Sequence, residues 1–222
     1  MAERVSICID GGNFYHLALK KIGIRVDEFD FVQFALFLAG DRVICDGGKR
    51  YYAGTVRERE DDLKSKEAMS TQNRLFSRLI NDHWKLKTSK LRRRMEEIII
   101  DRRTVDYDKL WKLGIHKIEQ ERWREKGIDV KLATDLIAGA LDDKYDTVIL
   151  VSSDGDLIPA IDWVRQRTKK KVEYVGFSIM NNEDESKSTK PLLSMIPRTD
   201  TLRVISEKEL SPFILKTEGL FD

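Results

Sequence analysis

Two wholly apolar runs, each ending close to an aspartate, constrain the fold of this chain more than any other feature. Residues 5–9 read VSICI and lead into Asp10, and residues 147–151 read TVILV and lead through two serines into Asp154. A continuous apolar run of this length is typical of a strand buried on both faces of a parallel sheet. Glycine follows each aspartate and a helical pattern comes next, so each run predicts a strand, a tight turn and a helix.

Helical and strand patterns alternate along the rest of the chain. Helices are expected near 31–38, 61–83, 131–141, 157–167, 191–196 and 206–214. Strands are expected near 49–56, 83–91, 171–177 and 201–205. This alternation predicts one α/β domain over residues 1–222 with a mostly parallel sheet. An inserted basic segment at about 92–127 interrupts it, and its Trp-containing charged stretch is expected to be helical.

Cysteine and histidine usage excludes several classes of protein. With two cysteines, Cys8 and Cys45, and three scattered histidines, a chain of 222 residues has neither a disulfide framework nor a zinc-ligand pattern. A reducing, cytoplasmic setting fits best. The N-terminus shows no basic-then-apolar leader, and no apolar run is long enough to span a bilayer, so no membrane partner is expected.

The carboxyl ends of the two apolar strands are where chemistry is expected. In an open parallel sheet, ligands bind where the strand order reverses, outside the carboxyl ends of the strands. If the two strands are neighbours, Asp10, Asp154 and Asp156 converge there together with the Asn13 amide. Packed carboxylates repel one another unless a cation compensates. An all-oxygen ligand set favours Mg²⁺ or Mn²⁺, which suits phosphoryl chemistry.

Two more acids precede the second apolar strand, and capping is the competing role for several of these residues. Asp135 lies beside the apolar stripe of the 131–141 helix, and Asp129 comes six residues earlier, where a loop position is favoured. Asp156 could simply cap the following helix. Because two glycines separate Asp10 from its helix, we expect Asn13 to be the better cap there.

The stretches VSICIDGGNFY, IDVKLATDLIAGAL and DTVILVSSDGDLIPAIDWVRQRTKKKVEYVGF resemble the NYN domain family, the LabA-like branch of the PIN-like nuclease superfamily. The resemblance implies a Rossmann-like, three-layer α/β/α fold and a metal-dependent ribonuclease site. It implies Asp10, Asp135, Asp154 and Asp156 as metal ligands, and Asn13 as the polar residue beside them. Asp129 matches an acid that commonly precedes the helix.

The function expected on this basis is metal-dependent hydrolysis of phosphodiester bonds by an endoribonuclease using Asp10, Asn13, Asp135, Asp154 and Asp156. Two alternatives stay open: a catalytically weak or idle module of the same fold that binds nucleic acid or another protein, and a DNA-directed nuclease. The family often has S-G-D-x-D-F where this chain has Ser152, Ser153, Asp154, Gly155, Asp156 and Leu157. This departure affects backbone shape and packing but none of the expected ligands.

The charge distribution supports a polyanionic partner that the near-neutral total of +2 conceals. Residues 85–103 contain eight Lys and Arg against three acids. We expect nucleic-acid contacts from Lys90, Arg92, Arg93 and Arg94 in this run and from Arg57, with RNA favoured over DNA. Tyr51, Tyr52, Trp84 and Trp123 could stack on unpaired bases, although core packing is the favoured role of each. A homodimer is left open.

Overall fold

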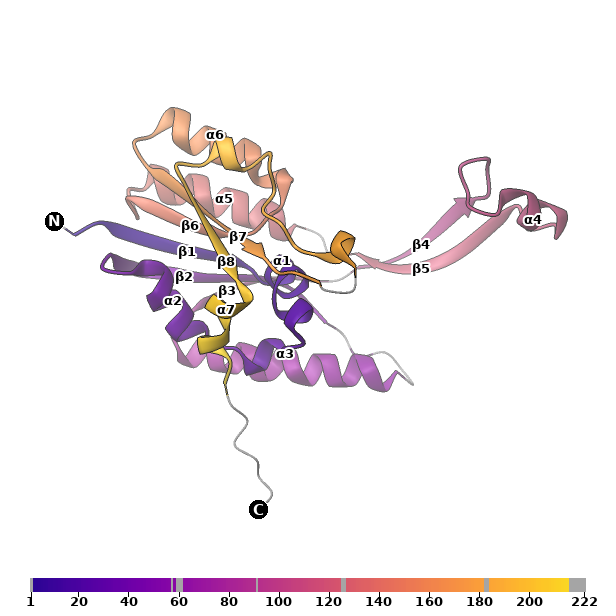
Figure 1. Ribbon diagram of the computed structural model, residues 1–222, viewed down its shortest axis with the longest axis horizontal. Coiled ribbons are helices and arrows are strands. Elements are labelled where there is room, and N and C mark those ends of the chain that lie inside the picture. Colours follow the sequence, from indigo (N-terminus) through magenta and orange to yellow (C-terminus); the bar gives the residue numbers. More distant parts are fainter. Residues whose placement is uncertain are drawn as a thin grey trace, which may run out of the picture.

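The structure is a computed structural model that describes residues 2–56, 58, 62–90, 92–124, 127–181 and 184–215. Its main body is a six-stranded sheet in the order β3-β2-β1-β6-β7-β8, with every neighbouring pair parallel (Figure 1). The strands are β1 Arg4–Asp10, β2 Val43–Thr55, β3 Lys85–Lys90, β6 Thr147–Val151, β7 Lys171–Ser178 and β8 Thr201–Ser206. The predicted α/β fold with a parallel sheet is confirmed.

Helices cover both faces of the sheet, as the strand order requires. The chain moves outward from β1 to β3, returns to β6 beside β1, and then moves outward in the opposite direction. Because crossovers between parallel strands are right-handed, this reversal places the two sets of helices on opposite faces. On one face lie α1 Gly11–Leu17, α2 Phe31–Ala39 and α3 Leu63–Asn81, and on the other lie α5 Ile128–Leu141 and α6 Ile158–Arg167.

The core forms two apolar clusters, one on each side of the sheet. In β1, Ile7 and Ile9 pack toward α1 and α2, whereas Cys8 packs toward α5 and α6. Successive strand residues point to opposite faces, so Asp10 follows Cys8 onto the α5 face. In the first cluster, the Phe14 ring stacks on Phe34 with centroids 5.5 Å apart. These contacts fix the start of α1 against the end of β1.

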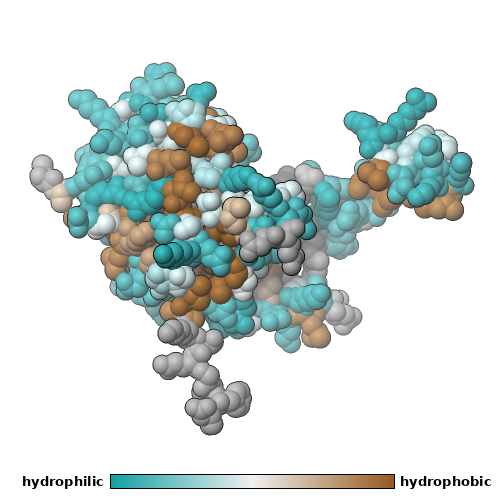
Figure 2. All heavy atoms as spheres, in the orientation of Figure 1, coloured by the Kyte–Doolittle hydropathy of each residue, from teal (hydrophilic) through white to brown (hydrophobic). Residues whose placement is uncertain are grey.

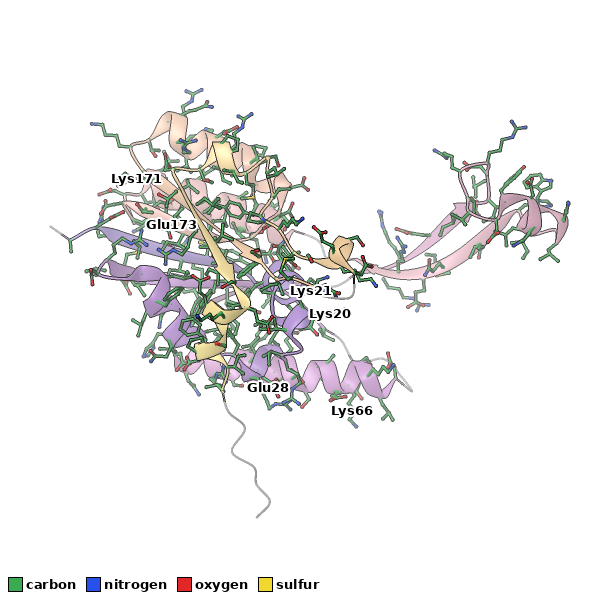
Figure 3. The ribbon with its side chains drawn as sticks, in the orientation of Figure 1. Lys20, Lys21, Glu28, Lys66, Lys171 and Glu173 are labelled. Atoms are coloured by element: carbon green, nitrogen blue, oxygen red, sulfur yellow. The ribbon has the colours of Figure 1, made fainter. Side chains whose placement is uncertain are left out.

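A buried carboxylate in β7 is explained by its neighbours. Glu173, labelled in Figure 3, is 3% exposed and pairs with Arg42 at 2.8 Å and with Arg203 at 2.7 Å. A charge removed from water is tolerated only when it is paired. Glu173 therefore ties the end strand β8 to the loop that precedes β2, and it has no part in the edge of the sheet described below.

Most helix boundaries follow the predicted signals. The Asp30 side chain caps α2 by accepting from the backbone N–H groups of Val32 and Gln33. The last α-helix of the described residues is α7 Glu207–Leu210, whose first turn has a capping box formed by Ser206 and Glu209. The helix predicted at 191–196 is wrong: turns lead there into a single 3-10 segment, Ile196–Arg198. Pro191 and Pro197 bound that stretch, and proline cannot donate a helical hydrogen bond.

The inserted segment forms an arm that projects from the body (Figure 1). Strands β4 Arg92–Ile99 and β5 Lys117–Arg124 pair antiparallel, and α4 Tyr107–Lys112 lies near the outer end. The expected helix in this region is therefore wrong except for the single short element around Trp111. Figure 2 shows a mixed hydrophilic and hydrophobic outer end, where Val105 is 85% and Leu113 is 73% exposed.

Among the described residues, none of the helices combines the length and the apolar character that crossing a membrane requires.

Candidate metal centre

The site lies at the carboxyl edge of the sheet, between its two central strands. The register of β1 and β6 sets Ile9 opposite Val151, so Asp10 and the segment that follows Val151 emerge side by side. The strand order reverses between these same two strands. Ligands of open α/β sheets bind at this reversal, so the fold places the predicted acids where a ligand is expected.

Three carboxylates meet at this edge. Asp10, Asp129 and Asp154 each offer an oxygen atom, and these three atoms all lie within 4.8 Å of one another. Asp10 ends β1, Asp129 lies in the first turn of α5, and Asp154 follows β6. Asp10 is 7% exposed, whereas Asp154 is half-buried and Asp129 exposed. We call these three residues the acid cluster.

Hydrogen bonds hold Asp10 against the loop that carries Asp154. The Oδ1 atom of Asp10 accepts from the backbone N–H of Asn13 at 3.0 Å, and its Oδ2 atom accepts from the Ser152 hydroxyl at 3.2 Å. The Ser152 Oγ atom in turn accepts from the backbone N–H of Asp154 at 3.2 Å. The buried Ser152 hydroxyl therefore couples the positions of two acids in the cluster.

The Asn13 side chain joins the same two segments. Its Oδ1 atom accepts from the backbone N–H of Ser153 at 2.8 Å, while its Nδ2 group donates to no described residue. The Ser153 hydroxyl lies 2.6 Å from the Tyr174 hydroxyl, so the serine that stands in the family's glycine position has a buried partner. Asn13 thus fixes the loop and keeps one donor for a ligand.

The capping expectations are wrong at both strand ends. Asp10 caps α1, because the helix begins at Gly11 rather than after the two glycines. Asp154 caps the 3-10 segment Gly155–Leu157 by accepting from the backbone N–H of Asp156 at 2.9 Å. The Asp156 side chain caps no described helix and is exposed.

The electrostatics of the acid cluster favour a cation. Burial raises the pKa of Asp10, its hydrogen bonds from Asn13 and Ser152 lower it, and the charges of Asp129 and Asp154 raise it further. Burial also raises the pKa of Asp129, and so do the charges of Asp154 and Asp156. Neighbouring carboxylates destabilise one another when ionised. A positive ion at this point would relieve that repulsion.

The donor set fits a hard divalent ion. Every member offers carboxylate oxygen, and no described His or Cys belongs to the group. Mg²⁺ and Mn²⁺ prefer such ligands, and Mg²⁺ takes only a few carboxylates while leaving positions for water and substrate phosphate. The exposure of Asp129 and the half-exposure of Asp154 leave that side of the cluster open to a substrate.

Asp135, expected as a metal ligand, lies outside the acid cluster. Its Oδ2 atom accepts from the Tyr52 hydroxyl at 2.8 Å and lies 3.2 Å from Lys87 Nζ and 3.9 Å from an Arg50 nitrogen. Six residues of helix separate it from Asp129, a rise of about 9 Å away from the sheet edge. The structure therefore brings Asp129 to the cluster and gives Asp135 a separate set of cationic partners.

Two of the predicted nucleic-acid contacts have described side chains, Arg93 and Arg94, and both lie on β4 of the arm. Arg93 is exposed and pairs with Glu121 at 2.9 Å, whereas Arg94 is exposed and has no ion pair with any described residue. Arg57 and the side chains of Lys90 and Arg92 lie outside the described residues.

Arg122 was not named from the sequence among the basic residues of interest, although the strand register sets it directly opposite Arg94. The only signal for it was the spacing of charged residues in KIEQERWR, which looked helical.

Comparison with known proteins agrees with this architecture. The family model described as the NYN domain matches residues 4–195. The crystal structure of a protein of unknown function from Vibrio parahaemolyticus has a similar fold, with a TM-score of 0.50 and 21% sequence identity, covering 96% of this chain and 97% of that chain. At that identity the likeness supports the fold alone. No match was found among the curated proteins.

Proposed function

This chain belongs to the NYN domain family, and from that premise we propose that it is a metal-dependent endoribonuclease. NYN domains are part of the PIN-like nuclease superfamily, which makes nucleic acid the expected substrate. The observation that carries the proposal is the convergence of Asp10, Asp129 and Asp154 at the strand-order reversal. Assignment to the LabA-like branch, and residues 1–222 as one nuclease domain with an insertion, are parts of the same proposal.

In this proposal Asp10, Asp129 and Asp154 hold Mg²⁺ or Mn²⁺. When bound, such an ion polarises a phosphodiester and lowers the pKa of a water molecule beside it. Ser152 keeps Asp10 and the Asp154 loop in register, and Asn13 holds that loop while its Nδ2 group is left to donate to a phosphate oxygen. The charge of Asp156 helps to raise the pKa of Asp129, so the two side chains lie close together. In this proposal Asp156 is a further catalytic residue at the exposed side of the site.

The root of the arm is the proposed approach for the substrate. We define the arm root as residues 92–94 and 122–124. Strand β3 ends at Lys90 just before the root, and α5, which carries Asp129, begins at Ile128 just after it. This closeness along the chain to the helix that carries Asp129 supports an approach of the substrate past the arm root. Arginine binds phosphate through paired donors, which supports a role in holding a nucleic-acid backbone.

A cleavage assay tests the proposal. The wild-type protein should cut single-stranded RNA in Mn²⁺ and lose this activity in EDTA. The Asp154→Asn protein should cleave RNA at least about 10- to 100-fold more slowly, because losing only an outer partner of a metal ligand already costs that much. Asp142→Asn serves as the matched control, because Asp142 lies at the opposite end of α5 from Asp129 and is exposed.

Duplex RNA and single-stranded DNA form the other arms of the assay. Cleavage of DNA at an equal or greater rate would favour the DNA-directed alternative. Binding of RNA without Mn²⁺-dependent cleavage would favour the module that binds without cutting. Activity that survives both EDTA and Asp154→Asn would contradict the proposed metal site.

A further inference from the structure

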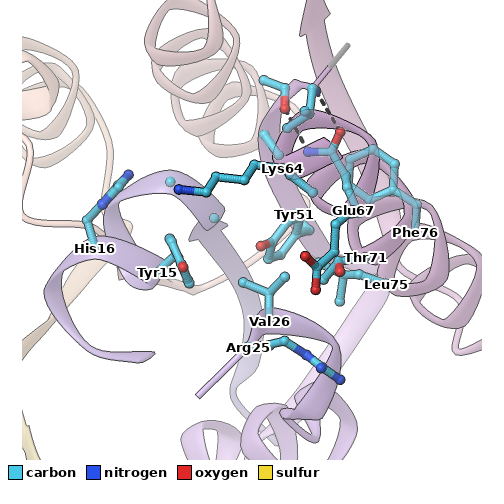
Figure 4. Close-up of a pocket in the computed structure, with 17 residues that line it drawn as sticks. Tyr15, His16, Arg25, Val26, Tyr51, Lys64, Glu67, Thr71, Leu75 and Phe76 are labelled. Carbon is cyan, nitrogen blue, oxygen red and sulfur yellow. Dashed lines mark hydrogen bonds between the residues drawn. The ribbon is translucent and has the colours of Figure 1, made fainter. Parts of the chain in front are cut away.

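A cavity of about 510 Å³ is lined by residues of α1, of α3 and of the end of β2 (Figure 4). It opens between α1 and α3 above the end of β2. Its walls are largely apolar and aromatic: Tyr15, Val26, Tyr51, Leu75 and Phe76. This size and lining are typical of a site for a small organic group, because such pockets combine apolar walls with a few polar atoms that fix orientation.

Tyr51 supplies an unpartnered polar atom to this cavity. The residue is 3% exposed, and its hydroxyl forms no hydrogen bond with any described residue. Figure 4 shows this hydroxyl among the residues that line the cavity. Tyr51 lines the cavity, so its hydroxyl can bond water there or a ligand that displaces the water. A ligand that offers a hydrogen-bonding edge would satisfy it.

The cavity and the acid cluster share a thin wall made by Gly11 and Gly12. A Cβ atom at Gly11 would overlap the Tyr51 ring, and one at Gly12 would lie 3.6 Å from Asp10 Oδ1. Gly11 and Gly12 also line the cavity, so a group bound there lies close to the carboxylate of Asp10. A bound polymer whose phosphate lies at the acid cluster would therefore place the group next to that phosphate in or near the cavity.

The charged residues of the cavity suit a nucleotide. Lys64, His16 and Arg25 line it together with one acid, Glu67. In Figure 4 the Lys64 side chain extends from α3 toward the α1 side of the cavity. Cations around an aromatic, apolar interior match a flat base joined to a charged backbone.

We propose that this cavity binds an unstacked nucleobase next to the scissile phosphate, with the Tyr51 hydroxyl bonding the edge of the base. The proposal rests on the nuclease function and adds to it a preference for single strands. A base that is paired and stacked in a duplex has no free edge to present and must leave the stack before it can enter. The base can be part of a nucleic-acid strand or of a free nucleotide, and the proposal commits to the strand.

Binding measurements on a cleavage-inactive Asp154→Asn background, without divalent ions, test this subsite. The probes are a labelled single-stranded oligouridylate, a duplex of equal length and uridine 5′-monophosphate. Tyr51→Phe removes one oxygen atom and should weaken binding of the single strand about 10-fold, the value of one hydrogen bond. Duplex binding should not change. The protein should stay as stable as its parent, because the hydroxyl has no internal partner to lose.

A second variant fills the cavity. Thr71→Trp, on the α3 wall, should weaken single-strand binding at least as much as Tyr51→Phe. Ser77→Trp, at an exposed position of the same helix, is the matched control and should have no effect. If Thr71→Trp does not fold, Tyr51→Phe alone decides.

Unchanged single-strand binding in Tyr51→Phe would overturn the subsite and leave the cleavage result untouched. The subsite would also be overturned if Tyr51→Phe weakened binding of the mononucleotide but not of the single strand. Equal losses for single strand and duplex would also overturn it. Failure of the wild-type protein to cleave RNA, with Tyr51-dependent binding intact, would instead overturn the nuclease function and support the base site.

Discussion

The Oδ1 atom of Asn13 accepts a hydrogen bond from the backbone N–H of Ser153 at 2.8 Å. Residues 140 positions apart are thereby joined across the top of the two central strands. The carbonyl oxygen of the Asn13 side chain is therefore committed to the loop that carries Asp154. Its first role is to position that loop.

Replacing Asn13 with alanine should therefore affect stability as well as activity. The Ser153 N–H would lose its partner in a partly buried place, which costs about 1–2 kcal/mol of unfolding free energy. Cleavage should fall about 10- to 100-fold, as for other groups that orient metal ligands. Urea unfolding and the cleavage assay measure the two effects. Asn73→Ala, at an exposed position of α3, should change neither.

The main sheet could be predicted from the sequence because its strands carry their own signal. VSICI and TVILV are apolar apart from Ser6 and Thr147, which follows from burial on both faces by two helical layers. The arm could not be predicted in this way. A projecting two-stranded ribbon has no buried face, so the charged residues of β5 show no apolar alternation and resemble an exposed helix.

The two acids at strand ends could be predicted from the sequence, whereas the acid that α5 contributes to the site was harder to predict. Asp10 and Asp154 follow directly from two strand ends. The apolar pattern does not make the choice between Asp129 and Asp135: the resemblance implies Asp135, whereas the structure brings Asp129, in the first turn of α5, to the acid cluster. The helix was expected from residue 131 but begins at Ile128, so Asp129 lies in its first turn and not in the loop that was expected there.

This choice gives a second prediction. Asp129→Asn should weaken Mn²⁺ binding at least 10-fold, because it removes a member of the acid cluster. Asp135→Asn should change Mn²⁺ affinity by less than about 3-fold, since its carboxylate is occupied by Tyr52 and Lys87. Calorimetric titration of both proteins measures the difference. The reverse order of affinities would restore Asp135 as the ligand.

Gly11 and Gly155, which follow the ends of β1 and β6, should differ sharply in how well they tolerate replacement by alanine. A Cβ atom at Gly11 would overlap the buried Tyr51 ring, whereas one at Gly155 would lie 3.7 Å from a Leu192 methyl carbon, an ordinary contact. Gly11→Ala should therefore destabilise the protein by about 1–3 kcal/mol through overpacking. Gly155→Ala should stay within about 0.5 kcal/mol. Thermal unfolding of the two proteins compares them, and equal stabilities would show that α1 does not start against Tyr51.

Asp27 should make stability depend on pH. Its side chain is 9% exposed and accepts from Arg74 at 2.9 Å and from Arg25 at 3.1 Å, joining α3 to the segment before α2. Burial raises the pKa of Asp27, but the hydrogen bonds and charges of Arg74 and Arg25 outweigh it and lower the pKa overall.

A lowered pKa in the folded state stabilises the protein above the ordinary carboxyl value of about 3.9. That contribution disappears as the pH falls through the folded value. Asp27→Asn should therefore cost about 1 kcal/mol at pH 7, because the arginines are half-exposed and screened. The difference from wild type should shrink toward pH 3, as the pH approaches the lowered folded pKa of Asp27. Unfolding by urea at both pH values measures this change, and a constant difference would show that the charge of Asp27 is not the cause.

The arm root should contribute to nucleic-acid binding through its charge. Arg94 and Arg122 lie directly opposite each other on β4 and β5, and Arg122 is partly offset by Glu96 at 3.4 Å. Like charges opposite each other destabilise a strand pair. Replacing both with glutamine should therefore leave stability unchanged or raised, so any loss of binding cannot be attributed to unfolding of the arm.

The double variant Arg94→Gln/Arg122→Gln should bind single-stranded RNA more weakly. It should also reduce the slope of log affinity against log salt concentration by about 1.4, since each phosphate contact on a single strand contributes about 0.7. The matched control is Arg103→Gln/Lys109→Gln. It loses the same charge near the outer end of the arm, where Arg103 and Lys109 already pair with Asp101 and Asp106. Its slope should stay at the wild-type value. Equal slopes for the two double variants would mean that net charge, and not the position of the arm root, governs binding.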